Sequence, residues 1–210
     1  FLLFMAIGPQ LKWIKSDLEN KLYLIIFLSI SMTISFFISK NLNTNILINS
    51  ILIGSALYLF LITIRDFFLK KSKNIHQNIS HFGFSLLILS ILFNNIFSSE
   101  IITNLRVGEN FKSNKFEIIF NDHKQTNEKN YISLKGDFTI KHPNNIKDKL
   151  EPELRIYNQP KIITSEADIK TTIFTDKFIT MNNVNNQEYF NIRYQIKPFM
   201  IWIWISVLLI

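Results

Sequence analysis

One of the four histidines of this chain lies in a stretch that has no other titratable side chain. His81 stands near the start of ISHFGFSLLILSILFNNIF, residues 79–97, which is long and apolar enough to cross a lipid bilayer as a helix. Ionisable side chains inside spanning helices are costly, and where they occur they are functional hypotheses by default. His81 is therefore the first candidate for a functional residue.

A neutral imidazole at this place can do either of two things. It can hydrogen-bond to a neighbouring helix as a packing contact, which is worth about 0.6 kcal/mol on average for polar contacts in membranes. It can also be an axial ligand of a haem, because an imidazole nitrogen binds iron directly and the porphyrin faces are apolar. Gly83, two residues further on, would ease the approach of a large planar group. A second histidine ligand needs another helix, and no other histidine of the chain lies in a predicted span.

The other three histidines are expected to be solvated. His76 lies in a basic loop, and His123 and His142 lie in polar stretches that we interpret as turns. The sequence has no paired carboxylates, no nucleophile beside a base and no glycine-rich phosphate loop. Four histidines without clustered carboxylates also predict no zinc site. Catalytic residues stay unknown from this sequence.

The elements that position His81 are predicted to be membrane helices. Besides 79–97, the runs 22–39 and 46–64 are of spanning length. The apolar segments 1–9 and 198–210 predict partial spans at both ends, the tail of a preceding helix and the start of a returning one.

Basic residues in the short loops predict the orientation of these spans. Loop 65–78 carries four cations against a single acidic residue, Asp66, and loop 10–21 carries three further lysines. By the positive-inside rule both loops face the cytoplasm. The helix 79–97 then delivers the residues downstream of it to the periplasm of a bacterium or the intermembrane space of a mitochondrion.

Residues 98–197 have a different character, with nearly balanced charges and a period-two alternation of apolar residues, which predicts a small antiparallel β domain outside the membrane. The expected strands are KFEIIFN, YISLKGDFTIKH with a turn at Gly136–Asp137, ELRIYN, KIIT, TTIFTDKFITM and EYFNIRYQIK. The last strand shows the pattern most clearly. Its buried face is predicted to hold Phe190, Ile192, Tyr194 and Ile196. Its solvent face is predicted to hold Asn191, Arg193 and Gln195.

The predicted fold class is therefore a polytopic α-helical membrane protein, with three full spans plus partial spans at both ends and an inserted small antiparallel β domain outside the membrane. The composition agrees, since 48% of the 210 residues are hydrophobic and 20 are Phe. These residues include no Cys, which excludes a disulfide, a thiolate metal site or a CxxC redox motif among them. Much of the net charge of +7 lies in loops beside spans, so it does not indicate a nucleic-acid partner.

Several segments in this order resemble the CcmF haem lyases of system I cytochrome c maturation and the related NrfE-type lyases. They are GPQLKW (8–13), SHFGFSLLIL (80–89), LEPELRIYNQP (150–160), TSEADI (164–169), FTDKFITM (174–181) and NIRYQIKPFMIWIW (191–204). The resemblance covers nearly the whole chain and identifies it as a C-terminal part of such a protein. Asn182 and Asn183 stand where the family has Gly-Glu, so we assign no function to that position.

The resemblance implies a late step of cytochrome c assembly, in which haem from a CcmE-like haem chaperone is attached to the CxxCH cysteines of apocytochrome c. It implies haem lyase activity in complex with CcmH/CcmI-like partners, in the bacterial or mitochondrial inner membrane. It also implies that His81 is one of two transmembrane histidines that hold the iron of a b-type haem, an electron carrier with quinol as the electron source. The second ligand, the catalytic residues and the external haem-handling residues would lie upstream.

Two functions of other classes stay open from the residues themselves. The chain could belong to a transporter or permease subunit whose β domain binds a partner, with His81 as a packing or proton-relay residue. It could also be a membrane scaffold in which the β domain carries the whole function. Both predict that the protein binds no chromophore.

Overall fold

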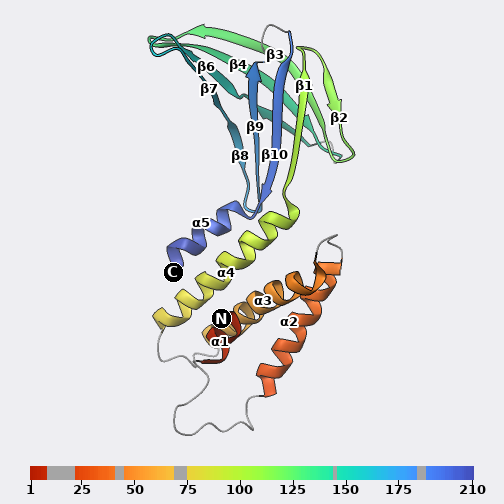
Figure 1. Ribbon diagram of the computed structural model, residues 1–210, viewed down its shortest axis with the longest axis vertical. Coiled ribbons are helices and arrows are strands. Elements are labelled where there is room, and N and C mark those ends of the chain that lie inside the picture. Colours follow the sequence, from red (N-terminus) through yellow and green to blue (C-terminus); the bar gives the residue numbers. More distant parts are fainter. Residues whose placement is uncertain (9–21, 41–44, 69–74, 144–145, 184–187) are drawn as a thin grey trace. The chain divides into compact units, whose positions relative to one another are not determined.

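The computed structural model describes residues 1–8, 22–40, 45–68, 75–143, 146–183 and 188–210. These fold into two compact units, one helical (1–97 with 199–210) and one built of strands (98–198), which Figure 1 shows along the chain. Each unit has its own buried apolar cluster and is described by itself.

The described part of the helical unit holds three long apolar helices and two short ones. They are α1 (Leu2–Ile7), α2 (Leu22–Lys40), α3 (Ile46–Phe68), α4 (Ile75–Phe97) and α5 (Met200–Leu209). By length and composition α2, α3 and α4 can each cross a membrane, which confirms three full spans. Both α3 and α4 extend beyond the predicted apolar runs. Since α4 starts at Ile75, His76 lies in its exposed first turn rather than in a loop.

Small residues allow α2 and α3 to pack closely. A Cβ added to Gly54 of α3 would lie 2.7 Å from Met32 Sδ and 2.8 Å from Ser35 Oγ of α2. The hydroxyls of Ser31 and Ser35 are buried at this contact, and each donates to a backbone carbonyl of its own helix, three residues back. Close approach through small residues is the usual packing of membrane helices, because lipid tails and apolar side chains are equally apolar.

Two antiparallel sheets form the other unit. Its strands are β1 (Ser99–Leu105), β2 (Asn110–Lys112), β3 (Glu117–Asn127), β4 (Tyr131–Lys141), β5 (Lys147–Leu150), β6 (Glu153–Tyr157), β7 (Ile162–Glu166), β8 (Asp168–Thr171), β9 (Thr175–Asn183) and β10 (Phe190–Pro198). One sheet has the order β1-β10-β9-β8 and the other β2-β3-β4-β6-β7, with β5 paired to β4. The sequence alone did not predict β1, β2, β5 or β8. The single strand predicted at TTIFTDKFITM (171–181) is wrong in its first part, because residues 172–174 form the turn between β8 and β9.

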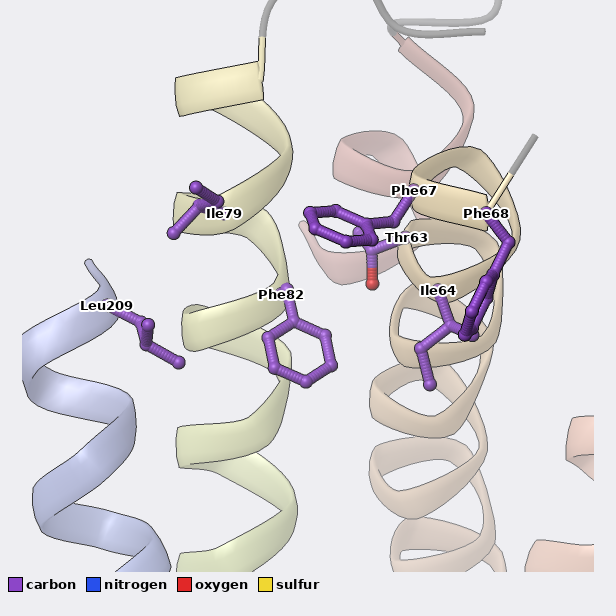
Figure 2. Close-up of a pocket in the computed structure, with 7 residues that line it drawn as sticks. All are labelled: Thr63, Ile64, Phe67, Phe68, Ile79, Phe82 and Leu209. Atoms are coloured by element: carbon purple, nitrogen blue, oxygen red, sulfur yellow. The ribbon is translucent and has the colours of Figure 1, made fainter. Parts of the chain in front are cut away.

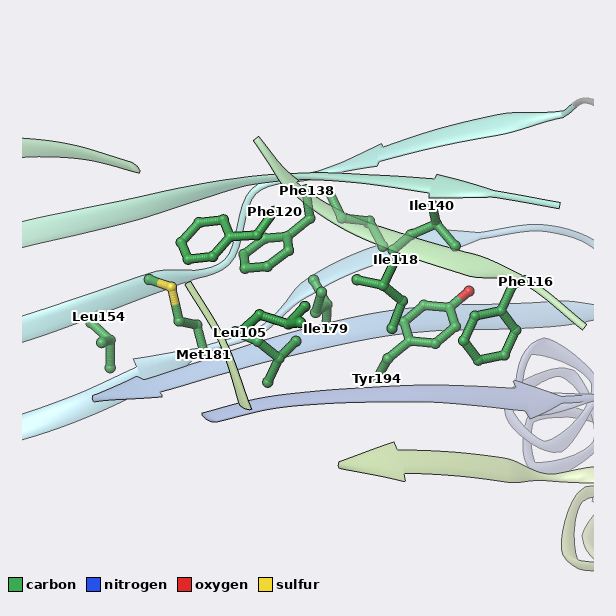
Figure 3. Close-up of a cluster of buried hydrophobic side chains, with 12 residues drawn as sticks. Leu105, Phe116, Ile118, Phe120, Phe138, Ile140, Leu154, Ile179, Met181 and Tyr194 are labelled. Carbon is green, nitrogen blue, oxygen red and sulfur yellow. The ribbon is translucent and has the colours of Figure 1, made fainter. Parts of the chain in front are cut away.

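The two sheets share one apolar core, drawn in Figure 3. The rings of Phe120 and Phe138 stack with centroids 4.4 Å apart, and Phe116 meets Tyr194 edge to face at 4.9 Å. The predicted inner face of β10 is confirmed. Ile192 and Tyr194 lie in the core, with Phe190 and Ile196 packed against it.

The prediction for the other face of β10 is wrong at one residue. Arg193 is exposed as expected, but Gln195 is only 6% exposed. In the sheet register Gln195 lies between Glu100 of β1 and Phe178 of β9, and its amide hydrogen-bonds to the Glu100 carboxylate. Neighbouring strands therefore cover a side chain that alternation assigns to solvent.

The predicted turn at Gly136–Asp137 is also wrong, because β4 runs through both residues. Opposite them, β3 has a register shift between Phe120 and Asp122. The Gly136 N–H donates to Pro152 O at 2.9 Å, and a Cβ added here would lie 2.5 Å from the Phe138 ring. Glycine is needed because a ring packs directly on the backbone, which is a known reason for glycine inside a strand.

Candidate functional site

His81 lies in the second turn of α4, half-buried. It lines a hollow of about 460 Å³ whose other lining residues come from its own helix and from α1. They are Gln77, Phe1, Phe4, Met5 and Gly8. Gln77 and His81 are four residues apart, so they share one face of α4. The helix α1, predicted as a partial span, thus supplies most of the lining of this hollow.

The residues around His81 fit one axial position of a haem. Two phenyl rings and the Met5 thioether suit an apolar macrocycle, and the imidazole is a nitrogen ligand for iron. The part of the chain that the structure describes contains no group of three or more His, Cys, Asp or Glu that could hold a metal ion. As a haem ligand His81 would supply one axial position, and the described lining of this hollow holds no second histidine.

The expected function of Gly83 is wrong. A Cβ added to Gly83 would lie 2.8 Å from Leu209 Cβ and 3.1 Å from Ser206 O, both in α5. Residues two apart in a helix do not share a face, so Gly83 points away from the side of α4 that carries His81. Its small size lets α5 pack against α4.

A second hollow of about 430 Å³ lies between α3, α4 and α5 (Figure 2). Its lining is Thr63, Ile64, Phe67, Phe68, Ile79, Phe82 and Leu209. The only hydroxyl there, that of Thr63, donates within its own helix, to Leu59 O or Phe60 O at 2.9 Å. This pocket therefore offers apolar surface without a group that would orient a polar ligand.

Several residues used for the predicted topology lie outside the described residues, among them Trp13, Lys70, Lys71 and Lys73. The cytoplasmic placement of the two basic loops stays a prediction. Arg65 is described, and its guanidinium lies 3.0 Å from Asp66 Oδ1 and 3.5 Å from the centre of the Tyr23 ring. Its charge is thus compensated within the helical unit.

Sequence reasoning missed a buried charged cluster in the β unit. Asp148 of β5 has a side chain only 3% exposed. Its Oδ1 accepts a hydrogen bond from Lys170 Nζ at 2.8 Å, and its Oδ2 lies 2.7 Å from Lys177 Nζ. His142 Nε2 is 2.9 Å from Oδ2, so the prediction of a solvated His142 is wrong. We call these four residues the Asp148 cluster.

The Asp148 cluster joins the two sheets, because Asp148 belongs to the sheet of β4 and both lysines belong to the sheet of β9. Burial alone would raise the pKa of the Asp148 carboxyl. The hydrogen bonds from Lys170, Lys177 and His142 outweigh burial and hold this pKa well below its usual range. Burial, with the nearby charge of Asp148, raises the pKa of the Tyr194 phenol, which therefore stays neutral.

A weak sequence signal for this cluster existed. In KDKL, residues 147–150, Asp148 occupies the same alternation phase as Leu150, and both are buried. A carboxylate in the apolar phase of a strand predicts buried cations nearby, because an unpaired buried charge is too costly. His123 carries no such signal: it lies exposed in β3 rather than in a turn, with its ring 5.6 Å from that of Phe190.

Helices that can cross a bilayer, together with a β sandwich inserted between α4 and α5, define an integral membrane protein with a folded domain outside the lipid. Residues 96–198 match the family model described as the CcmF C-terminal β-sandwich. A solved structure titled cytochrome c heme lyase CcmF covers 99% of this chain with a TM-score of 0.73 at 18% identity, and 36% of that structure's chain is matched.

Two curated relatives align with almost all of this chain. Cytochrome c-type biogenesis protein CcmF of Haemophilus influenzae is 23% identical over 98% of this chain and 34% of its own length. The protein of the same name from Escherichia coli K12 is 22% identical over 97% of this chain and 33% of its own length. The chain belongs to the CcmF family, and it spans about one third of the length of these relatives. The predicted fold class and family are confirmed.

Proposed function

We propose that this chain is part of a membrane haem lyase of cytochrome c biogenesis, and that His81 is one axial ligand of a resident b-type haem. The names of the relatives support the first statement. The hollow at His81 supports the second and is the observation on which it rests. Within the described residues, His81 is the only histidine placed among the apolar residues of a long helix.

The residues at this hollow would act together on the bound group. The His81 imidazole would give a nitrogen lone pair to the iron, and the rings of Phe1 and Phe4 would exclude water from the porphyrin face. The amide of Gln77, one helical turn away on the same face, is the other polar side chain of the lining. A haem held by two imidazoles in apolar surroundings supplies one-electron transfer.

We further propose that the partners are a CcmE-like haem chaperone, CcmH/CcmI-like proteins and apocytochrome c, with quinol as the electron source. The membrane would be the bacterial or mitochondrial inner membrane, with the β sandwich in the periplasm or intermembrane space. The exposed ion pairs of the sandwich, such as Arg193 with Glu100 at 2.6 Å, suit the polar rim of a protein contact.

The test uses the full-length protein with His81→Ala, purified in detergent, and measures haem absorbance per protein. We expect loss of the b-haem spectrum while the protein still inserts into the membrane. His76→Ala is the matched control, because His76 lies exposed in the first turn of the same helix. In a His81→Gly variant, added imidazole should restore the spectrum. Normal haem content in His81→Ala would refute the assignment.

A further inference from the structure

The turn between β8 and β9 exposes two large apolar side chains. Ile173 and Phe174 at its centre are 64% and 61% exposed. Thr172 and Thr175 close the turn, with Thr172 N donating to Thr175 O at 2.9 Å and Thr175 N to Thr172 Oγ1 at 3.1 Å. Turns in water favour Gly, Asn, Asp, Pro and Ser, each for a backbone or hydrogen-bonding reason. An isoleucine and a phenylalanine held at a fixed turn tip therefore suggest apolar surroundings.

The sheet register places this turn at the end of the sandwich from which the chain enters and leaves the lipid. Thr175 pairs with Pro198, and Ser99 pairs with Ile196 at the other side of β10. The spanning helix α4 ends at Phe97 and the apolar helix α5 begins at Met200. Both are within two residues of these paired positions. Figure 1 shows the turn end of β8 and β9 beside the end of β10.

Simple distances relate the turn tip to the start of α5. Thr175 lies about 5 Å from Pro198, the usual distance between paired residues of neighbouring strands, and each further residue of a strand advances about 3.3 Å. Each headgroup layer is roughly 5–8 Å thick, half the difference between the full bilayer and its hydrocarbon core. A side chain one or two residues beyond Thr175 is therefore within this distance of the point where the chain enters α5.

Both lysines beside the turn are compensated within the sandwich. Lys170 and Lys177 flank the turn on β8 and β9, and both bind the Asp148 carboxylate. The four residues of the turn itself, 172–175, carry no charge. The tip itself therefore presents apolar surface, and the carboxylate that follows it, that of Asp176, is half-buried at the start of β9.

We propose that the β8–β9 turn inserts Ile173 and Phe174 into the lipid surface from which α4 emerges, so that the sandwich rests on the membrane at this end. The partner is the boundary between headgroups and acyl chains, where aromatic and branched apolar side chains of peripheral segments settle. Ile163 of β7, an equally exposed apolar residue of the sandwich, does not share this place. Ile163 of β7 is 62% exposed, but its neighbour in the strand, Ser165, bonds to Met181 O, six residues along β9 from Thr175, or about 20 Å away.

Ile163 provides a control position of equal exposure. The experiment places a single cysteine at Phe174 or at Ile163 in the full-length protein, with other accessible cysteines replaced, and labels it with an environment-sensitive fluorophore. The protein is reconstituted into nanodiscs of equal parts phosphatidylcholine and phosphatidylglycerol. A fraction of the lipid carries a nitroxide quencher on the upper acyl chain. We expect about half of the fluorescence at position 174 to be lost, since such segments lie roughly 5–10 Å deep, with little change at position 163. Equal quenching at both positions, or none at 174, overturns the proposal.

A second measurement separates lipid from a protein partner. A benzophenone amino acid at position 174 is photolysed in native membranes. A phospholipid adduct supports the proposal, and a reproducible adduct with another polypeptide in place of lipid overturns it. The double substitution Ile173→Ser with Phe174→Ser keeps the closing threonines. We expect it to raise the protease sensitivity of the sandwich in nanodiscs and to leave that sensitivity unchanged in detergent, where no lipid surface remains. Equal sensitivity of the variant and the parent protein in nanodiscs would contradict the insertion.

Discussion

Replacing Asp148 with Asn should strongly destabilise the β sandwich. The substitution keeps the size of the side chain and removes the charge that holds two lysines of the opposite sheet. Most of the lost stability is expected to come from Lys177, because its side chain is only 19% exposed and would be left without a counter-charge. Lys170, 47% exposed, can turn toward water.

The magnitude depends on these exposures. Removing one partner of a buried ion pair costs about 3–5 kcal/mol, whereas an exposed pair contributes about 0–1 kcal/mol. Because Lys177 retains some access to water and the oxygen of the introduced amide can still accept one hydrogen bond, we expect a loss of about 2–4 kcal/mol, below the full buried-pair value. With a urea m-value of about 1–2 kcal/mol/M for a domain of this size, the unfolding midpoint falls by roughly 1–3 M.

The assay is pulse proteolysis in urea on the full-length protein in nanodiscs, following the fragment from the sandwich. Glu188→Gln is the matched control: it makes the same change of charge in the same unit, at a side chain 82% exposed that lies 3.3 Å from Arg106. We expect its effect to stay within about 0.5 kcal/mol, as for most surface substitutions. Equal midpoints for the Asp148→Asn and Glu188→Gln variants would refute the reasoning.

The pH dependence gives an independent check. The pKa of Asp148 is lowered in the folded state, so its stabilisation is fully present above the unfolded pKa of about 3.9 and is lost as the pH falls toward the folded pKa. The difference in stability between the parent protein and Asp148→Asn should therefore be constant near neutral pH and shrink below about pH 4. A difference that grows on acidification would contradict the assignment.

Four further predictions can be tested with standard measurements. Lys177→Met should also destabilise the sandwich, and combined with Asp148→Asn it should cost less than the sum of the two single effects, as measured by a double-mutant cycle. Gly136→Ala should cost about 1–3 kcal/mol in the same urea assay, because the added Cβ meets the Phe138 ring at 2.5 Å. Gly83→Ala should lower the thermal unfolding midpoint in detergent by separating α5 from α4, whereas Gly8→Ala, with nothing within 4 Å of the added Cβ, should not. A tag inserted after Asn130, in the β3–β4 turn, should react with a membrane-impermeant reagent added outside the membrane. A tag inserted after Lys73 should react only after the membrane is permeabilised. The reverse pattern would refute the predicted orientation.

The helical unit could be predicted from sequence because the membrane imposes a local rule. A spanning helix needs about 20 apolar residues, and this condition is met within one continuous segment, so α2, α3 and α4 are readable without their neighbours. The inner face of β10 was equally readable, since Ile192 and Tyr194 follow the period of two that a half-buried strand requires. His81 stood out for the same reason, as a titratable group inside such a segment.

Several of the errors concern residues whose environment the local sequence pattern does not reveal. Gly83 is small because α5 packs on it. Gly136 is small because the Phe138 ring of its own strand and Met181 of β9 pack on it. His142 was assigned to solvent because its neighbours are polar. It is buried because Asp148 and Lys177 meet it from other strands.

The sequence by itself determined which segments are long and apolar enough to cross a bilayer, which region forms strands, and which histidine is the candidate haem ligand. Hydrophobic length and periodicity are properties of consecutive residues, so they can be recognised without knowledge of the fold. Only the tertiary structure decided which groups meet: α1 with His81 around one hollow, Asp148 with two lysines across the sandwich, and the β8–β9 turn with the end of β10. Such contacts depend on strand order and helix packing, which bring together residues that are far apart in the chain.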